Sequence, residues 1–217
     1  KGRADLLTGN GYRELHYSGP GTDLQIFLPE GHNWKSAGFK TRSGIPFTAN
    51  IPTEEVFTLP DAAKTNGTVS STRPLAYAGN VIDGFKLTFK DGNVVDYSAR
   101  EGEKTLGNLL KIDEGASRLG EVALVPNSSP ISQSGLLFFN TLLDENASCH
   151  LALGAAYQFN LDGGEDMTQE EFASKGGNVS LIHEDFMIGS GKLDVDGVLS
   201  SGKVDPILRN GEWAFSL

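Results

Sequence analysis

Residues 85–98, Phe-Lys-Leu-Thr-Phe-Lys-Asp-Gly-Asn-Val-Val-Asp-Tyr-Ser, contain the pattern that decides the fold class. Apolar and polar side chains alternate on both sides of a short centre, which is the period of a β-strand with one buried face. The centre, Asp91-Gly92-Asn93, consists of residues that tolerate the positive φ required by tight turns. The stretch therefore predicts a β-hairpin.

The same turn signal recurs along the chain, which contains 27 glycines. Short alternating segments such as Leu24–Leu28 lie between the turns, and the stretch from Lys192 to Phe215 predicts further strands. The chain is therefore predicted to be rich in β-structure. Asn-Gly or Asp-Gly pairs begin at Asn10, Asn66, Asp83, Asp91, Asp162, Asp196 and Asn210.

Helical signals are fewer. Residues 101–112 carry leucines at helical spacing and acidic residues in the first turn. Residues 142–156 are mostly small and apolar and predict a second helix that begins near Asp144, a plausible N-cap. Thr168-Gln-Glu-Glu171 resembles a capping box that opens a third. Without an internal repeat or linker, residues 1–217 are predicted to form one β-rich α+β domain with mixed or antiparallel twisted sheets and a few helices.

Composition narrows the classes of function. Hydrophobic residues make up 38% and charged residues 21% of the chain, as in ordinary globular proteins. The 18 basic and 28 acidic residues give a net charge of −10, which opposes binding to nucleic acid or to an anionic membrane. No apolar run approaches the ~18 residues of a membrane span. A single cysteine, Cys149, excludes an intramolecular disulfide and favours a reducing compartment, the cytoplasm.

Metal-ligating side chains gather in four segments. His183-Glu-Asp185 follows the apolar run Val179–Ile182, which predicts a strand, and alternation then places His183 and Asp185 on one face. An imidazole beside a carboxylate suits zinc, cobalt, manganese or iron. A salt-linked pair at a strand end is the alternative.

His150 and Tyr157 form a second candidate pair. Two turns of a helix span about 7.2 residues, so these side chains would project together if residues 142–156 are helical. Both side chains could then project into one cavity. The alternative is a core histidine with an ordinary buried tyrosine.

Glutamates complete the set. Glu121 adjoins the apolar run Val122–Val125, and an ionised carboxylate there is costly without a partner, which is either a metal or a basic residue such as Arg118. In an extended segment, Glu54 and Glu55 point in opposite directions, so at most one of them joins a common site.

Together the segments offer carboxylates, two imidazoles and a phenol, which suit divalent cations that activate water against an amide or ester. The residues alone do not separate two metals from one. A mononuclear iron oxygenase with His150, His183 and Asp185 as ligands is one alternative, and a metal-free binding or dimerisation module is another.

The four segments resemble the C-terminal domain of the bacterial M29 metallo-aminopeptidases, the aminopeptidase T, S and II group. The matching stretches follow one another in the family's order across most of the chain. They are residues 51–57 (Ile-Pro-Thr-Glu-Glu-Val-Phe), 115–123 (Gly-Ala-Ser-Arg-Leu-Gly-Glu-Val-Ala), 140–157 (Asn-Thr-Leu-Leu-Asp-Glu-Asn-Ala-Ser-Cys-His-Leu-Ala-Leu-Gly-Ala-Ala-Tyr) and 183–189 (His-Glu-Asp-Phe-Met-Ile-Gly).

The resemblance implies two adjacent divalent metals, zinc, cobalt, manganese or magnesium, with Glu121 as the bridge. It implies cytosolic, homodimeric enzymes that release N-terminal residues from peptides, and an N-terminal domain that this chain lacks. Tyr157 matches the family's active-site tyrosine and is expected to stabilise the oxyanion, while Glu54 is a candidate general base. The implied metal ligands are Glu55, Glu121, His150, His183 and Asp185.

Overall fold

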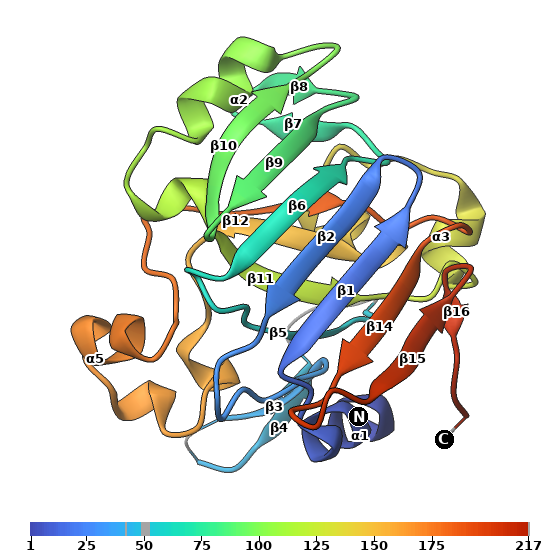
Figure 1. The fold of residues 1–217 in the computed structure, drawn as a ribbon. Coiled ribbons are helices and arrows are strands. Elements are labelled where there is room, and N and C mark those ends of the chain that lie inside the picture. The colour runs from blue at the N-terminus through green and yellow to red at the C-terminus, as the bar shows by residue number, and fades with distance from the viewer. Residues whose placement is uncertain (42, 49–52, 217) are drawn as a thin grey trace.

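The structure, a computed structural model, describes residues 1–41, 43–48 and 53–216, and a large antiparallel sheet dominates it (Figure 1). The hairpin predicted from residues 85–98 lies at one edge of this sheet. Lys90 pairs with Asn93, and Asp91 and Gly92 between them have φ angles of 50° and 80°. In order, the strands of this sheet are β10 (Asn93–Ser98), β9 (Lys86–Lys90), β6 (Thr65–Ser70), β2 (Thr22–Phe27), β1 (Glu14–Gly19), β14 (Asp194–Val198), β15 (Val204–Arg209) and β16 (Glu212–Trp213).

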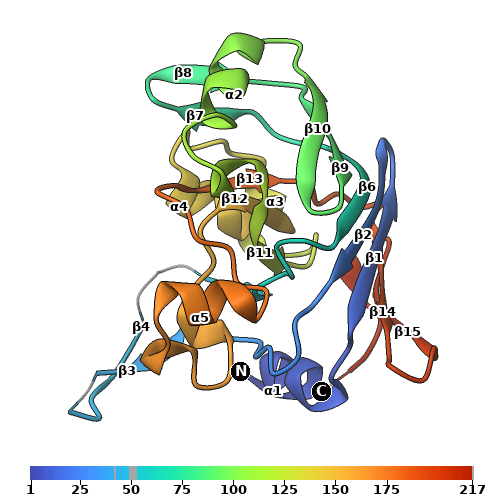
Figure 2. The same ribbon diagram turned by 60° about the vertical axis from the view of Figure 1, so that its left-hand side comes forward.

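A second antiparallel sheet lies beside the first (Figure 2). One hydrophobic core joins the two sheets: it includes Tyr17 and Leu24 from the first and Leu151 and Phe186 from the second. The outer face of the second sheet is therefore the one available for a site, and α4 and α5 lie on that side. The strands of the second sheet are, in order, β13 (His183–Met187), β12 (His150–Gly154), β11 (Leu119–Leu124) and β5 (Val56–Thr58).

Short helices and hairpins complete the fold. The capping box at the start of α5 is confirmed, because the Thr168 hydroxyl accepts from the Glu171 N–H and the Glu171 carboxylate accepts from the Thr168 N–H. The antiparallel sheets with few helices confirm the predicted α+β class. The helices are α1 (Gly2–Asn10), α2 (Glu103–Leu109), α3 (Pro130–Ser134), α4 (Thr141–Asp144) and α5 (Gln169–Ser174), with 3₁₀ turns η1 (Gly115–Ser117), η2 (Glu145–Ala147), η3 (Gln158–Asn160) and η4 (Gly164–Asp166), and the hairpins are β3 (Gly38–Lys40) with β4 (Pro46–Thr48) and β7 (Leu75–Tyr77) with β8 (Asn80–Ile82). In the described parts of the chain, no helix has the length and apolar character that a bilayer crossing demands.

The helix predicted over residues 142–156 is wrong. Its first residues form α4 and η2, but His150–Gly154 form β12, which pairs with a strand on each side. Every residue of β12 is buried. A strand covered on both faces needs no polar alternation, so its apolar run is not distinguishable from a buried helix by periodicity.

Two smaller expectations also fail. Residues 179–182 precede a strand rather than form one, because β13 begins at His183. Asp196-Gly197 lies inside β14 instead of at a turn. A Cβ on Gly197 would lie 2.6 Å from the Tyr12 ring, so this glycine permits close packing rather than chain reversal.

Gly154, at the end of β12, should not tolerate a side chain. Its φ is +100°, and a Cβ there would lie 2.2 Å from the carbonyl oxygen of Ile182. Substitution to alanine is expected to lower the free energy of unfolding by roughly 3 kcal/mol or more, measured by urea denaturation. The matched control, Gly9→Ala in α1, meets nothing within 4 Å and should raise stability by up to about 1 kcal/mol. Equal stability of the two variants would contradict this account.

Candidate metal centre

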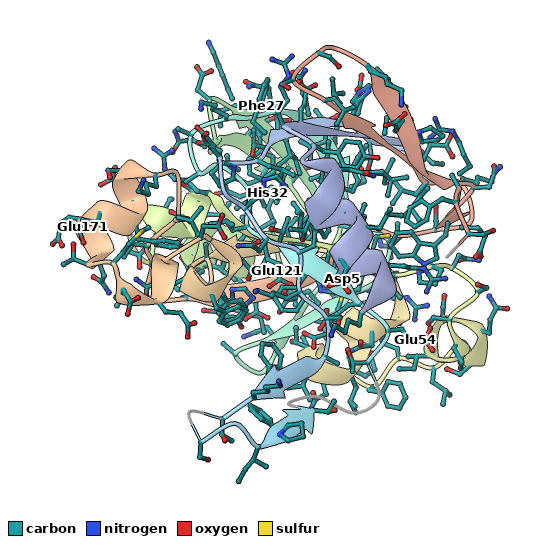
Figure 3. The ribbon with its side chains drawn as sticks, turned by 90° about the horizontal axis from the view of Figure 1, so that it is seen from below. Asp5, Phe27, His32, Glu54, Glu121 and Glu171 are labelled. Carbon is teal, nitrogen blue, oxygen red and sulfur yellow. The ribbon has the colours of Figure 1, made fainter. Side chains whose placement is uncertain are left out.

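A cavity of about 570 Å³ contains most of the predicted site residues. Glu121 lies near the middle of the molecule seen from below, while Glu171 on α5 lies at its edge (Figure 3). His150 lies in the same cluster and is fully buried. The ionisable side chains that line the cavity are Glu55, Glu121, Glu145, Tyr157, His183, Glu184 and Asp185.

Strand register brings these residues together. Ala152 of β12 pairs with Glu121 of β11 on one side and with Asp185 of β13 on the other. Residues paired in this way project from the same face of a sheet. Because Ala152 is small, the two carboxylates can approach each other above it. Gly154, opposite His183, leaves similar room.

Glu121 lies between the two histidines. Its Oε1 is 3.5 Å from His150 Nε2, and its Oε2 is 3.8 Å from His183 Nε2. Glu55 Oε2 lies 3.2 Å from His150 Nε2, and Asp185 Oδ1 lies 3.5 Å from His183 Nε2. The cluster thus has two halves that share one carboxylate, each oxygen facing a different imidazole. Arg118, the alternative partner of Glu121, donates instead to the carbonyl oxygen of Ala62.

Backbone carbonyls orient both imidazoles. His150 Nδ1 lies 3.1 Å from the oxygen of Ser148, and His183 Nδ1 lies 2.7 Å from that of Ala155. In the neutral ring Nδ1–H donates to the carbonyl and the Nε2 lone pair faces the carboxylates, which is the arrangement of a metal-binding histidine. A lone pair facing carboxylate oxygens is repulsive unless a proton or a metal cation lies between them.

Two buried polar atoms also indicate that the cluster binds a cation. In the part of the chain that the structure describes, His150 Nε2 and Asp185 Oδ1 are buried without a hydrogen-bond partner. Such atoms are costly in a folded protein unless an ion or another group satisfies them. The donor set of nitrogen and oxygen atoms fits zinc, cobalt or manganese.

The electrostatics show how strongly negative the cluster is. Burial raises the pKa of Glu121 to about 7, although the neighbouring histidines oppose the shift. Burial and then the charge of Asp185 raise the pKa of Glu145 to about 8. Burial lowers the pKa of His183, but the neighbouring Asp185 carboxylate outweighs it and raises the value to about 9. The carboxylates are thus crowded enough to hold protons, which divalent cations would replace.

Glu145 was missed by the sequence analysis. It joins His150 and Asp185 in a third group whose potential ligand atoms all lie within 4.8 Å of one another. A helix over residues 142–156 would place side chains five residues apart about 140° from each other, so Glu145 and His150 would have pointed apart. The bend from η2 into β12 brings them together.

The other two predicted residues have different positions. Tyr157 lines the cavity, with its ring centroid 4.6 Å from that of His183. Glu54 is exposed and lies outside the lining of this cavity, next to Glu55, which lies inside it. Both glutamates line a neighbouring cavity, and only Glu55 also reaches the metal cluster. Among the stretches used for the family resemblance, Ile51 and Pro52 fall outside the described residues.

Comparison with protein families gives an independent result. A family model described as thermophilic metalloprotease (M29) matches residues 1–213. Aminopeptidase 2 of Geobacillus stearothermophilus is 55% identical over 98% of this chain and 52% of its own length. Aminopeptidase T of Thermus thermophilus is 47% identical over 95% of this chain and 50% of its own length. The chain spans about half the length of the curated relatives it matches.

Solved structures agree. Wild-type AmpT from Thermus thermophilus superposes with a TM-score of 0.93 and 46% identity, covering 99% of this chain and 53% of that one. A 2,5-dihydroxypyridine dioxygenase from Pseudomonas putida has a TM-score of 0.64 and 13% identity, covering 98% of this chain and 58% of the dioxygenase. At that identity the second likeness concerns the fold alone.

Proposed function

The chain belongs to the M29 family of metallopeptidases, and from that premise we propose that it forms the catalytic part of an aminopeptidase that releases N-terminal residues from peptides. The observation that carries the proposal is Glu121, whose two oxygens face two different histidines. A carboxylate in that position can bridge two divalent cations.

The proposed metal ligands are Glu55, Glu121, His150, His183 and Asp185, to which the structure adds Glu145. Two divalent ions there would lower the pKa of a shared water and polarise the scissile carbonyl. Ser148 and Ala155 orient the imidazoles through their backbone oxygens. Tyr157, which lines the cavity, would donate a hydrogen bond to the oxyanion as it develops. Glu54 remains a candidate general base that would act from the neighbouring surface.

The finer expectations stay part of this proposal. The substrates are peptides with a free α-amino group, the metal is zinc, cobalt, manganese or magnesium, and the active form is a homodimer. Residues 1–217 correspond to the C-terminal catalytic domain of the family. The cytoplasm is the expected compartment, consistent with the buried, unpaired thiol of Cys149.

Metal content is the first test of this function. After saturation with Zn²⁺ or Co²⁺ and removal of the excess, elemental analysis should find two ions per chain. At a free-ion concentration of 100 Kd, each ion should add about 2.7 kcal/mol to the free energy of unfolding, and a chelator should reverse the gain. Hydrolysis of leucine p-nitroanilide should stop with the chelator and return with the ion.

The same measurement separates the alternatives. One ion per chain would favour a mononuclear site made by His150, His183 and Asp185, as in the oxygenase hypothesis. That hypothesis leaves the close approach of Glu55 and Glu121 to His150 without a role. A chain that binds no metal would support a binding or dimerisation module.

A further inference from the structure

We propose that Asn178 is a positioning residue of the metal centre, because its side chain helps to fix the backbone carbonyl that orients His183. Asn178 lies between α5 and β13 and is not one of the proposed ligands. The inference rests on the proposed function and deepens it. It predicts that Asn178 controls the affinity for one of the two ions and not for the other.

The carbonyl oxygen of Ala155 orients the His183 ring. It lies 2.7 Å from His183 Nδ1, so its position decides where Nε2 points. Ala155 follows Gly154, the last residue of β12, whose φ is +100°. Because a glycine can adopt many backbone conformations, Gly154 does not by itself fix the direction of the peptide planes around Ala155. The Ala155 carbonyl therefore depends on hydrogen bonds from other segments.

These hydrogen bonds come from the segment that precedes β13. A peptide group is planar, so fixing one end of the plane also fixes the other. In the first plane, the Gly154 carbonyl accepts from Asn178 Nδ2 at 2.6 Å, and the Ala155 N–H donates to the Ile182 carbonyl at 2.6 Å. In the next plane, which contains the Ala155 carbonyl, the Ala156 N–H donates to the carbonyl oxygen of Asn178 at 2.9 Å. Asn178 thus holds one end of each plane.

Asn178 is itself anchored in the protein interior. Its side chain is buried, and Nδ2 also donates to the carbonyl oxygen of Gly115, in η1, at 2.8 Å. The carbonyl oxygen of Arg118, at 3.5 Å, is a more distant acceptor. A side-chain amide has two N–H donors, and the two short bonds use both of them. One side chain therefore joins the entry to β11, the end of β12 and the segment that leads into β13.

The two halves of the cluster differ in how they depend on Asn178. His150 is oriented by Ser148 at the start of β12, whereas Asn178 binds Gly154 at the end of that strand. Loss of the Asn178 side chain should therefore loosen His183 and leave His150 in place. The His183 half consists of Glu121, His183 and Asp185, and the His150 half consists of Glu55, Glu121 and His150.

The test measures how tightly the chain binds each of its two ions. Asn178→Ala removes both donors from the carbonyls of Gly115 and Gly154. Calorimetric titration with Zn²⁺ against a competing chelator should find one affinity unchanged within about twofold and the other about tenfold weaker, at the lower end of the effect of residues that support a ligand. Asn178→Asp keeps the shape of the side chain but places an oxygen against those carbonyls, so its loss should be at least as large.

Double variants identify the half that is affected. In a His183→Ala background the imidazole that Asn178 positions is gone, so adding Asn178→Ala should change the remaining affinities by less than about twofold. In a Glu55→Gln background, which weakens the other half, Asn178→Ala should still cost about tenfold for one ion. Coupling to His183 without coupling to Glu55 distinguishes a residue that acts through His183 from one that only stabilises the fold.

A control variant measures the effect of lost stability alone. Val69→Ala in β6 shortens a fully buried side chain of the other sheet. It should lower the thermal midpoint and leave the ratio of the two ion affinities unchanged. In Asn178→Ala, raising the free-ion concentration about tenfold should restore the second ion, as elemental analysis would show.

Several results would overturn the proposal. These are equal weakening of both ions in Asn178→Ala, no change in either affinity, a selective loss that Val69→Ala reproduces, or an unaltered chain that binds fewer than two ions. The proposed function fails separately. A chain that binds two ions and hydrolyses no aminoacyl amide refutes the activity, while control of one ion by Asn178 in that chain supports the positioning role.

Discussion

Substitution of Glu121 by glutamine should remove metal from both halves of the cluster and abolish peptide hydrolysis. Both Glu121 oxygens face imidazoles, so one change affects two ligand groups at once. Loss of a partner that only supports a ligand costs roughly 10–100-fold in affinity or activity. Loss of the shared ligand itself should therefore lower kcat/KM for leucine p-nitroanilide by more than that, with less than one ion bound per chain.

The Glu121 prediction has a matched control and one result that would contradict it. Glu170→Gln removes an equivalent carboxylate from the exposed surface of α5 and should retain full metal content and activity. Circular dichroism should show that both variants keep the sheet structure. If a metal-free Glu121→Gln protein hydrolyses the substrate at the unaltered rate, the metal centre is not the catalytic site.

Tyr157→Phe should lower kcat by roughly 100–1,000-fold, or about 3–4 kcal/mol, with little change in KM. The substitution removes only the hydroxyl, so the stacking on Phe159 and the contact with His183 remain possible. Burial raises the pKa of the Tyr157 phenol above its ordinary value, so the group keeps its proton and can donate a hydrogen bond at neutral pH. Steady-state kinetics with leucine p-nitroanilide measure the effect.

Two further measurements define the role of the hydroxyl. Elemental analysis of Tyr157→Phe should still find two ions per chain, since the phenol is not a ligand in the proposal. Tyr97→Phe in β10 of the other sheet, the matched control, should change kcat by less than about twofold. A normal kcat in Tyr157→Phe would leave oxyanion stabilisation to the metals and remove Tyr157 from the mechanism.

The local parts of the fold were predictable because their signals are local. Asp91-Gly92 turns and the Thr168 capping box depend on φ angles and hydrogen bonds within a few residues. Alternation also predicted that His183 and Asp185 lie together, because side chains on an extended segment alternate whichever strand lies beside it.

The assignment of His150 to a helix failed for a non-local reason. β12 becomes a central strand only because β11 and β13 bind its two edges. The same error hid Glu145, whose approach to His150 depends on the bend between η2 and β12. The family resemblance had nevertheless indicated histidines and carboxylates that the structure brings into one cluster, because it rests on the order of motifs and not on secondary structure.

The sequence by itself thus determined the β-rich α+β class, the hairpin turns, the family and the predicted ligands. Only the tertiary structure decided that Glu121 lies between two histidines, that Glu145 joins them, and that Tyr157 lines their cavity. The physical reason is that strand pairing joins residues far apart in the chain. The register of this pairing depends on every strand of the sheet and on the side chains that the strands bury together.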